Sequence, residues 1–147
     1  MNPDHLFLHS KSGSKLQVLF INRNAKYTFI LSHGNAEDIY LVETWLQTYF
    51  LKQVDVNCVV YEYTGFGESN GRLPGEQSLY EDIETVYLYL TENLNISPDN
   101  IILYGSKSLT VLSPEIKSSK YASKSPSKSV ICSCILSLIV TILTCFF

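Results

Sequence analysis

The chain has 147 residues, enough for one modest domain, and its formal charge of −3 is unevenly distributed. Residues 1–105 carry 13 Asp or Glu against 6 Lys or Arg, whereas residues 106–147 carry five Lys and one Glu. Sparse, unclustered basic residues argue against a nucleic-acid-binding surface in the first part. The four cysteines show no C-x-x-C spacing, so zinc or redox chemistry and a disulfide framework are not indicated. We therefore expect no metal and no cofactor.

The first hundred residues contain short apolar runs typical of strands. Leu6–Leu8 and Leu16–Ile21 flank a Ser- and Gly-rich turn, which predicts an antiparallel hairpin. Tyr27–Ser32, Asn57–Tyr63 and Asn100–Tyr104 have continuous apolar centres, the pattern of strands covered on both faces. Each of these runs is separated from the next by a segment long enough to hold a helix.

Two helices are predicted between these strands. The first runs from about Glu37 to Leu51, with one apolar face at helical spacing made of Ile39, Val42, Trp45, Leu46 and Tyr49. The second begins at Ser78-Leu79-Tyr80-Glu81, which matches a capping box, and continues to Asn95. Strands that alternate with helices predict an α/β fold, with a mostly parallel sheet and flanking helices, over residues 1–105.

The composition changes abruptly after Gly105. Residues 106–129 include nine Ser and five Lys, too polar to offset the entropy of ordering, which predicts a flexible linker. Residues 130–147 carry no charge, and as a helix they would span about 27 Å, close to the ~30 Å hydrocarbon core of a bilayer.

The apolar C-terminal run predicts a membrane anchor. Lysines flank it on one side only, and the N-terminus lacks the pattern of a signal peptide. We therefore expect residues 130–147 to form a transmembrane tail helix, with the preceding domain on the cytosolic face of a membrane and the lipid bilayer as a partner. If the tail does not insert, the protein is expected to be cytoplasmic. The alternatives are a buried core strand and an out-of-frame translation product.

One strand-to-helix corner has the residues expected of an acyl-transfer site. His33-Gly34-Asn35-Ala36 follows a strand and precedes a helix, a position from which the backbone N–H groups of Asn35 and Ala36 can stabilise a substrate oxyanion. An ordinary turn with Asn as a cap explains the same residues. His33 is predicted to be a buried structural histidine rather than a catalytic base. The two glycines of Gly65-Phe66-Gly67 favour a structural corner over a phosphate-binding loop.

Four motifs in this order resemble a known family. They are S-H-G-N-A at 32–36, Y-E-Y-T-G-F-G-E-S at 61–69, S-L-Y-E-D-I at 78–83 and I-S-P-D-N-I-I-L-Y-G at 96–105. Over about residues 3–105 the chain is similar to the α/β-hydrolase domain-containing protein 17 family, within the serine-aminopeptidase-like hydrolases. The resemblance implies a serine hydrolase ancestor that acts on fatty-acyl thioesters of palmitoylated membrane proteins, which would make acylated membrane proteins partners.

The sequence departs from this family after Gly105. A nucleophile elbow of the form G-x-S-x-G should follow, but its serine position holds Lys107, and Ser108 lies one residue late. No Asp or His follows Ser108, although the fold places its acid and base there. Omitting Ser106 would nearly restore the elbow, so a shifted or misspliced reading frame is one hypothesis for the tail.

Two functional hypotheses remain from the sequence. The first is a serine hydrolase of the depalmitoylating type, with Ser108 as a displaced nucleophile and Asn35 and Ala36 as oxyanion donors. Because the loss of a nucleophile or base costs such enzymes about 10⁶-fold in kcat, we expect little activity from these residues alone. The second is a non-catalytic, tail-anchored binding protein or a misassembled gene fragment.

Overall fold

The computed structural model describes residues 4–71, 73–105 and 130–132. Its first element is the predicted hairpin, in which β1 (Asp4–His9) pairs antiparallel with β2 (Lys15–Ile21). The connecting turn contains Gly13 at φ 86°, a conformation that glycine adopts without strain. The hairpin prediction is therefore confirmed, with β1 one to two residues longer at each end.

The two strands of the hairpin are the first two strands of a six-stranded mixed sheet, whose order is β1-β2-β4-β3-β5-β6. The added strands are β3 (Thr28–Ser32), β4 (Asn57–Tyr61), β5 (Ile101–Gly105) and β6 (Val130–Cys132). Pairings β2–β4 and β1–β2 are antiparallel, and the three pairings among β4, β3, β5 and β6 are parallel. The central strands β3 and β4 are buried along their whole length, as their continuous apolar runs predicted.

The first helical segment begins at Ile39 and ends at Gln53. It consists of α1 (Ile39–Trp45), a π-helical turn η1 (Leu46–Phe50) and α2 (Leu51–Gln53). Its N-cap is Asp38, whose carboxylate accepts the Leu41 N–H at 2.8 Å. The predicted apolar face is correct for Ile39, Val42 and Leu46, which are buried, and wrong for Trp45 and Tyr49, which are 39% and 62% exposed.

Two features explain the exposure of Trp45 and Tyr49. The π-helical turn has a longer period than an α-helix, which shifts the phase of Tyr49 relative to the buried residues before it. Trp45 lies on the flank of the helix beside β5, where it stacks on Phe50 at 5.2 Å between ring centroids. That flank borders an open cleft, which is described below.

The second helical segment begins earlier than predicted. α3 spans Glu76–Leu88 and continues as the π-helical turn η2 (Tyr89–Asn93), before the short 3-10 turn η3 (Pro98–Asn100). Its N-cap is Gly75, so the prediction of Ser78 as the cap is wrong. The Ser78 hydroxyl instead lies one turn inside the helix, where it accepts the Gly75 N–H at 2.9 Å and donates to the Gly75 carbonyl at 2.8 Å.

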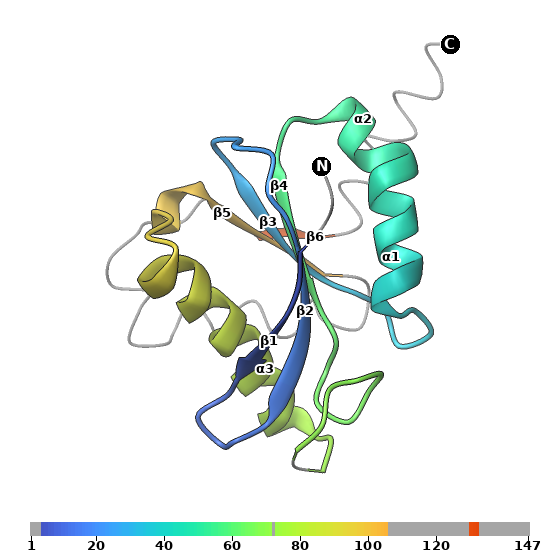
Figure 1. Cartoon of the computed structure of the whole chain (residues 1–147), viewed down its shortest axis with the longest axis vertical. Coiled ribbons are helices and arrows are strands. Elements are labelled where there is room, and N and C mark those ends of the chain that lie inside the picture. Colours follow the sequence, from blue (N-terminus) through green and yellow to red (C-terminus); the bar gives the residue numbers. More distant parts are fainter. Residues whose placement is uncertain (1–3, 72, 106–129, 133–147) are drawn as a thin grey trace.

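The helices lie on opposite faces of the sheet (Figure 1). One core cluster joins α3 to inward residues of β2, β3 and β4, and the other joins α1 to the alternate residues of the same strands. Ile30 and Val59 belong to the α3 side, whereas Leu31 and Val60 belong to the α1 side. This period of two is the one expected of strands covered on both faces.

The predicted linker, 106–129, lies outside the described residues. The predicted C-terminal helix is not seen either, because Val130–Cys132 form strand β6 and residues 133–147 lie outside the described part. Within the described ranges, no helix is both long and apolar enough to cross a membrane.

Candidate functional site

The sheet edge where β3 and β5 end is the candidate site. Ser32, the last residue of β3, is paired with Gly105, the last residue of β5. Loops that follow parallel strands meet at this carboxyl edge, which is where α/β proteins bind ligands. The segment from His33 to Asp38 is therefore beside the end of β5, the strand after which the sequence predicts a nucleophile.

The segment after β3 forms a tight turn with Asn35 and Ala36 at its centre. The Glu37 N–H donates to the Gly34 carbonyl at 3.0 Å, and the Glu37 carboxylate accepts the Gly34 N–H at 2.7 Å. Both central residues are exposed. Among the described residues, the Asn35 and Ala36 N–H groups have no hydrogen-bond acceptor. The turn thus presents two neighbouring N–H donors, the property required of an oxyanion site.

His33 and Glu62 form a buried ion pair beneath this turn. Their side chains are 1% and 3% exposed, and Nε2 of His33 lies 3.1 Å from Oε1 of Glu62, although the N–H is poorly aligned for a hydrogen bond. Nδ1 donates to the Gly34 carbonyl at 3.0 Å. Both ring nitrogens therefore face protein oxygens, the arrangement of a structural histidine, as predicted.

The pKa of His33 is raised above its ordinary value of 6.5. Burial by itself lowers this pKa, but contact with Glu62, the hydrogen bond to the Gly34 carbonyl and the charges of Glu62 and Glu37 outweigh it. These contacts raise the pKa because they favour the positively charged ring over the neutral one. Because Glu62 and the Gly34 carbonyl occupy both ring nitrogens, His33 is not placed to accept a proton from a nucleophile.

Glu62 also fixes the start of α1. Its second carboxylate oxygen, Oε2, accepts the Ile39 N–H at 3.1 Å, so one buried carboxylate holds both the histidine and the first turn of the helix. The Tyr63 hydroxyl adds to the same network by donating to the His33 carbonyl at 2.6 Å. Sequence reasoning missed this role of Glu62. The available signal was a single acid within the otherwise apolar run from Cys58 to Tyr63.

A second buried carboxylate holds the loop after β4. Asp82, on α3, accepts the Thr64 N–H at 2.8 Å and the Thr64 hydroxyl at 2.7 Å. The next residue, Gly65, has φ 87°, and Gly67 has φ 51°. The Glu62 side chain occupies the space that a Cβ atom at Gly67 would need. This geometry is that of the structural corner predicted for the two glycines, and it packs Gly67 against Glu62, which contacts His33.

A cleft of about 310 Å³ runs from the site along α1. Ser32, His33 and Glu37 line its end at the sheet edge. Its remaining lining is mainly apolar and comes from Leu31, Leu41, Val42, Trp45 and Tyr104. We name it the α1–β5 cleft, because it lies between that helix and that strand.

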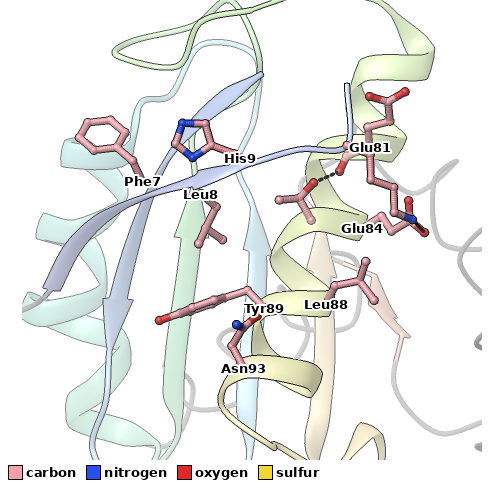
Figure 2. A pocket seen from close by; sticks show the side chains of 10 residues that line it. Phe7, Leu8, His9, Glu81, Glu84, Leu88, Tyr89 and Asn93 are labelled. Carbon is pink, nitrogen blue, oxygen red and sulfur yellow. Dashed lines mark hydrogen bonds and ion pairs between the residues drawn. The ribbon is translucent and has the colours of Figure 1, made fainter. Parts of the chain in front are cut away.

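A second hollow, of about 390 Å³, lies between β1 and α3 (Figure 2). Its lining includes Phe7, Leu88 and Tyr89 with the charged pair of Lys11 and Glu84, whose Nζ and Oε1 are 3.2 Å apart. It is on the α3 face, and its lining includes no residue of the turn after β3.

The structure therefore brings Asn35 and Ala36 to the predicted edge, and Ser108 lies outside the described residues. Within the described part of the chain, no three His, Cys, Asp or Glu side chains gather as metal ligands would. Cys58 is buried, and burial raises the pKa of its thiol to about 12, so it is not a nucleophile at neutral pH.

The fold resembles those of several solved hydrolases. An esterase from Pyrococcus furiosus superposes with a TM-score of 0.61 at 17% identity, covering 71% of this chain and 42% of the esterase. An α/β serine hydrolase homologue from Coxiella burnetii superposes with a TM-score of 0.63 at 17% identity, covering 82% and 60% of the two chains. At this identity the likeness establishes the fold.

Sequence comparison is more specific. Human α/β-hydrolase domain-containing protein 17B is 36% identical over 111 residues, which cover 73% of this chain and 37% of that protein. Protein 17C of Xenopus laevis is 34% identical over 113 residues, with 74% and 35% covered. A scan against protein-family models gave no match. The chain thus spans about a third of the length of these relatives. Over that stretch it belongs to the α/β-hydrolase family, as a homologue of the domain-containing proteins 17B and 17C.

Proposed function

We propose that residues 1–105 are the oxyanion-binding half of a serine-hydrolase site whose lineage chemistry is the hydrolysis of acyl thioesters on proteins. The observation that carries the proposal is the exposed turn of Asn35 and Ala36, whose two N–H donors lack acceptors among the described residues. An acyl carbonyl that becomes tetrahedral gains negative charge on oxygen, and two fixed donors stabilise it. The apolar α1–β5 cleft beside the turn could hold part of an acyl chain.

We further propose that these 147 residues do not complete the reaction. A serine must lose its proton to a base when it attacks the thioester, and the departing thiol must gain one. No His follows Ser108 in the sequence, and the ring of His33 is committed to Glu62 and Gly34. Stabilisation of the oxyanion without proton transfer gives binding but little turnover.

Nuclear magnetic resonance of the purified chain tests the first proposal. Dodecanoate, whose carboxylate resembles the reaction product, should shift the amide signals of Asn35 and Ala36 in a saturable way. Dodecanol is the matched control, because it has the same chain without the charge. The amide of Gly13, at the far hairpin turn, should not move with either compound.

Turnover of an acyl thioester, measured in the same samples, tests the second proposal. The release of thiol should not exceed that of the Ser108→Ala variant. Unmoved amides at Asn35 and Ala36 would overturn the oxyanion assignment, and thiol release that depends on Ser108 would overturn the assignment of inactivity.

A further inference from the structure

β1 is an outer strand of the sheet, and within the described residues no strand pairs with its free edge. It stands first in the strand order, next to β2 alone. Its register with β2 is unbroken from Asp4 to His9, so no β-bulge twists the edge away. The strand contains neither Lys nor Pro, and its centre is Leu6-Phe7-Leu8. Proteins usually protect an outer strand with such residues or with a bulge, because a regular apolar edge pairs readily with another strand.

The hairpin fixes which backbone groups of β1 point outward. The Ser10 N–H donates to the Ser14 carbonyl at 2.9 Å, so Ser10 turns its backbone toward β2. In an antiparallel pair this direction alternates along the strand. The even-numbered residues of β1 therefore bond to β2, whereas His5, Phe7 and His9 point their N–H and C=O groups away from it. Within the described part of the chain these outward groups have no hydrogen-bond partner.

The outward groups are self-complementary about Phe7. Two antiparallel copies of β1 with Phe7 opposite Phe7 bring His5 of each copy opposite His9 of the other. All of these are hydrogen-bonded pairs, in which each outward N–H of one copy meets an outward C=O of the other. A register shifted by one residue sets these groups against residues already bonded to β2, and a shift of two leaves one histidine of each copy opposite no residue of β1. The two copies are related by a two-fold axis, the commonest symmetry of protein dimers.

The side chains on both faces of β1 fit the same pairing. Phe7 is 40% exposed, with the Lys15 ammonium 3.7 Å from its ring centroid, and an aromatic pair across two strands stabilises a sheet. On the opposite face, Leu6 of each copy comes opposite Leu8 of the other. Both leucines already pack against the core cluster on the α3 side, so the pairing extends an apolar layer that the monomer leaves open.

The hollow between β1 and α3 lies where the second strand would come. Phe7, Leu8 and His9 line it together with residues of α3 and η2. Consecutive residues of a strand point to opposite faces, so a hollow that touches all three lies against the edge of the strand. Figure 2 shows Leu8 pointing toward Tyr89, with Phe7 and His9 on the other side of the strand. The hollow, of about 390 Å³, is therefore open where Leu6 of a second copy would lie.

We propose that two copies of this chain associate through β1, as an antiparallel pair centred on Phe7, so that their two sheets become continuous. The hydrogen bonds of the ladder set the direction and the register, and the side chains of Phe7 and Leu6 supply the apolar contacts. The interface lies on an outer strand, away from the turn of Asn35 and Ala36, so the assignment does not depend on the proposed hydrolase chemistry.

Disulfide cross-linking of the full chain tests the register. The Cα atoms of a hydrogen-bonded antiparallel pair are about 5.5 Å apart, a separation that suits a disulfide. Phe7→Cys should therefore oxidise to a dimer linked through position 7. His5→Cys alone and His9→Cys alone should not link through the new cysteine, whereas a mixture of the two variants should form a disulfide between positions 5 and 9. Peptide mass spectrometry distinguishes these bonds from any made by the native cysteines.

Sedimentation velocity over a series of concentrations tests the association itself. The wild type should sediment as a dimer that dissociates on dilution. Phe7→Lys replaces the aromatic pair with two opposed ammonium groups, so the dissociation constant should rise about tenfold or more. Tyr49→Lys, which replaces an exposed aromatic residue on η1, is the matched control and should leave the constant unchanged. Circular dichroism of both variants checks that the domain remains folded.

Three outcomes would overturn the proposal. One is a wild type that is monomeric at every concentration, together with a Phe7→Cys variant that forms no link at position 7. Another is a dimer whose dissociation constant is unchanged in a folded Phe7→Lys variant, which would place the interface elsewhere. The third is a His5→Cys variant that links to itself as readily as to His9→Cys, which would exclude the antiparallel register.

Discussion

At the residue scale, one carboxylate connects the elements that form the candidate site. Glu62 directly follows β4, contacts His33 after β3 and accepts the first N–H of α1. Burying a charge is costly unless it is paired, and here the partner is the His33 ring, whose pKa is raised. The geometry of the turn around Asn35 and Ala36 therefore depends on Glu62, which contacts the cleft-lining residue His33 but is not itself part of the lining.

The ion pair predicts a pH dependence of stability. Because the folded pKa of His33 is raised above 6.5, its stabilisation is fully present below pH 6.5 and is lost as the pH rises through the folded pKa. Each unit of elevation corresponds to about 1.4 kcal/mol. The free energy of unfolding in urea should fall over this range in the wild type. The fall should disappear in His33→Gln and persist in His9→Gln, an exposed control. A flat wild-type profile would contradict the assignment.

Asp82 allows a second test at this scale. Asp82→Ala leaves the N–H and hydroxyl of Thr64 without their acceptor inside the protein. Since an unsatisfied buried donor costs about 1–3 kcal/mol, the variant should lose about 2–4 kcal/mol of unfolding free energy. Glu81→Ala, the neighbouring and less buried acid, should lose less than about 0.5 kcal/mol, as surface substitutions do. Equal losses in the two variants would argue against the Thr64 contact.

At the element scale, local patterns predicted the type of each element better than its ends. Continuous apolar runs identified the strands because β3 and β4 are covered on both faces. The start of α3 was misplaced because a Ser three residues before a Glu fits a capping box, whereas the chain already turns into the helix at Gly75. The exposure of Tyr49 depends on a π-helical turn, and a search for apolar residues at 3.6-residue spacing cannot detect such a turn.

Glycines in the turns offer a graded prediction for the loops. Gly13 and Gly71 both have positive φ, at 86° and 144°, but only Gly71 packs against backbone, with an added Cβ 2.6 Å from Cα of Ser14. Gly13→Ala should cost about 1–2 kcal/mol from backbone strain alone. Gly71→Ala should cost about 1–3 kcal/mol more, because overpacking adds to the strain. Thermal unfolding measures the difference, and equal costs would contradict the close approach to Ser14.

At the scale of the whole molecule, the sequence predicted which strand-to-loop corners meet at the sheet edge, but not the contacts that hold those corners in place. Strand-to-loop corners are local features, so Asn35 and Ala36 could be placed at the sheet edge from their motif. The contacts of Glu62 with His33 and of Asp82 with Thr64 join residues 29 and 18 positions apart in the sequence. The spacing of apolar residues within one helix or strand cannot predict such distant contacts. The strand β6 was likewise hidden, because an uncharged run of 18 residues fits a membrane helix and gives no sign that its first three residues form a strand.

We propose that this chain keeps the oxyanion half of a hydrolase site without an activated nucleophile. The most direct measurement is the intact mass of the purified chain after treatment with a fluorophosphonate, which adds covalently to activated serines. We expect no adduct on the wild type, as on Ser108→Ala. A stoichiometric adduct in the wild type that maps to Ser108 and is absent from Ser108→Ala would contradict it.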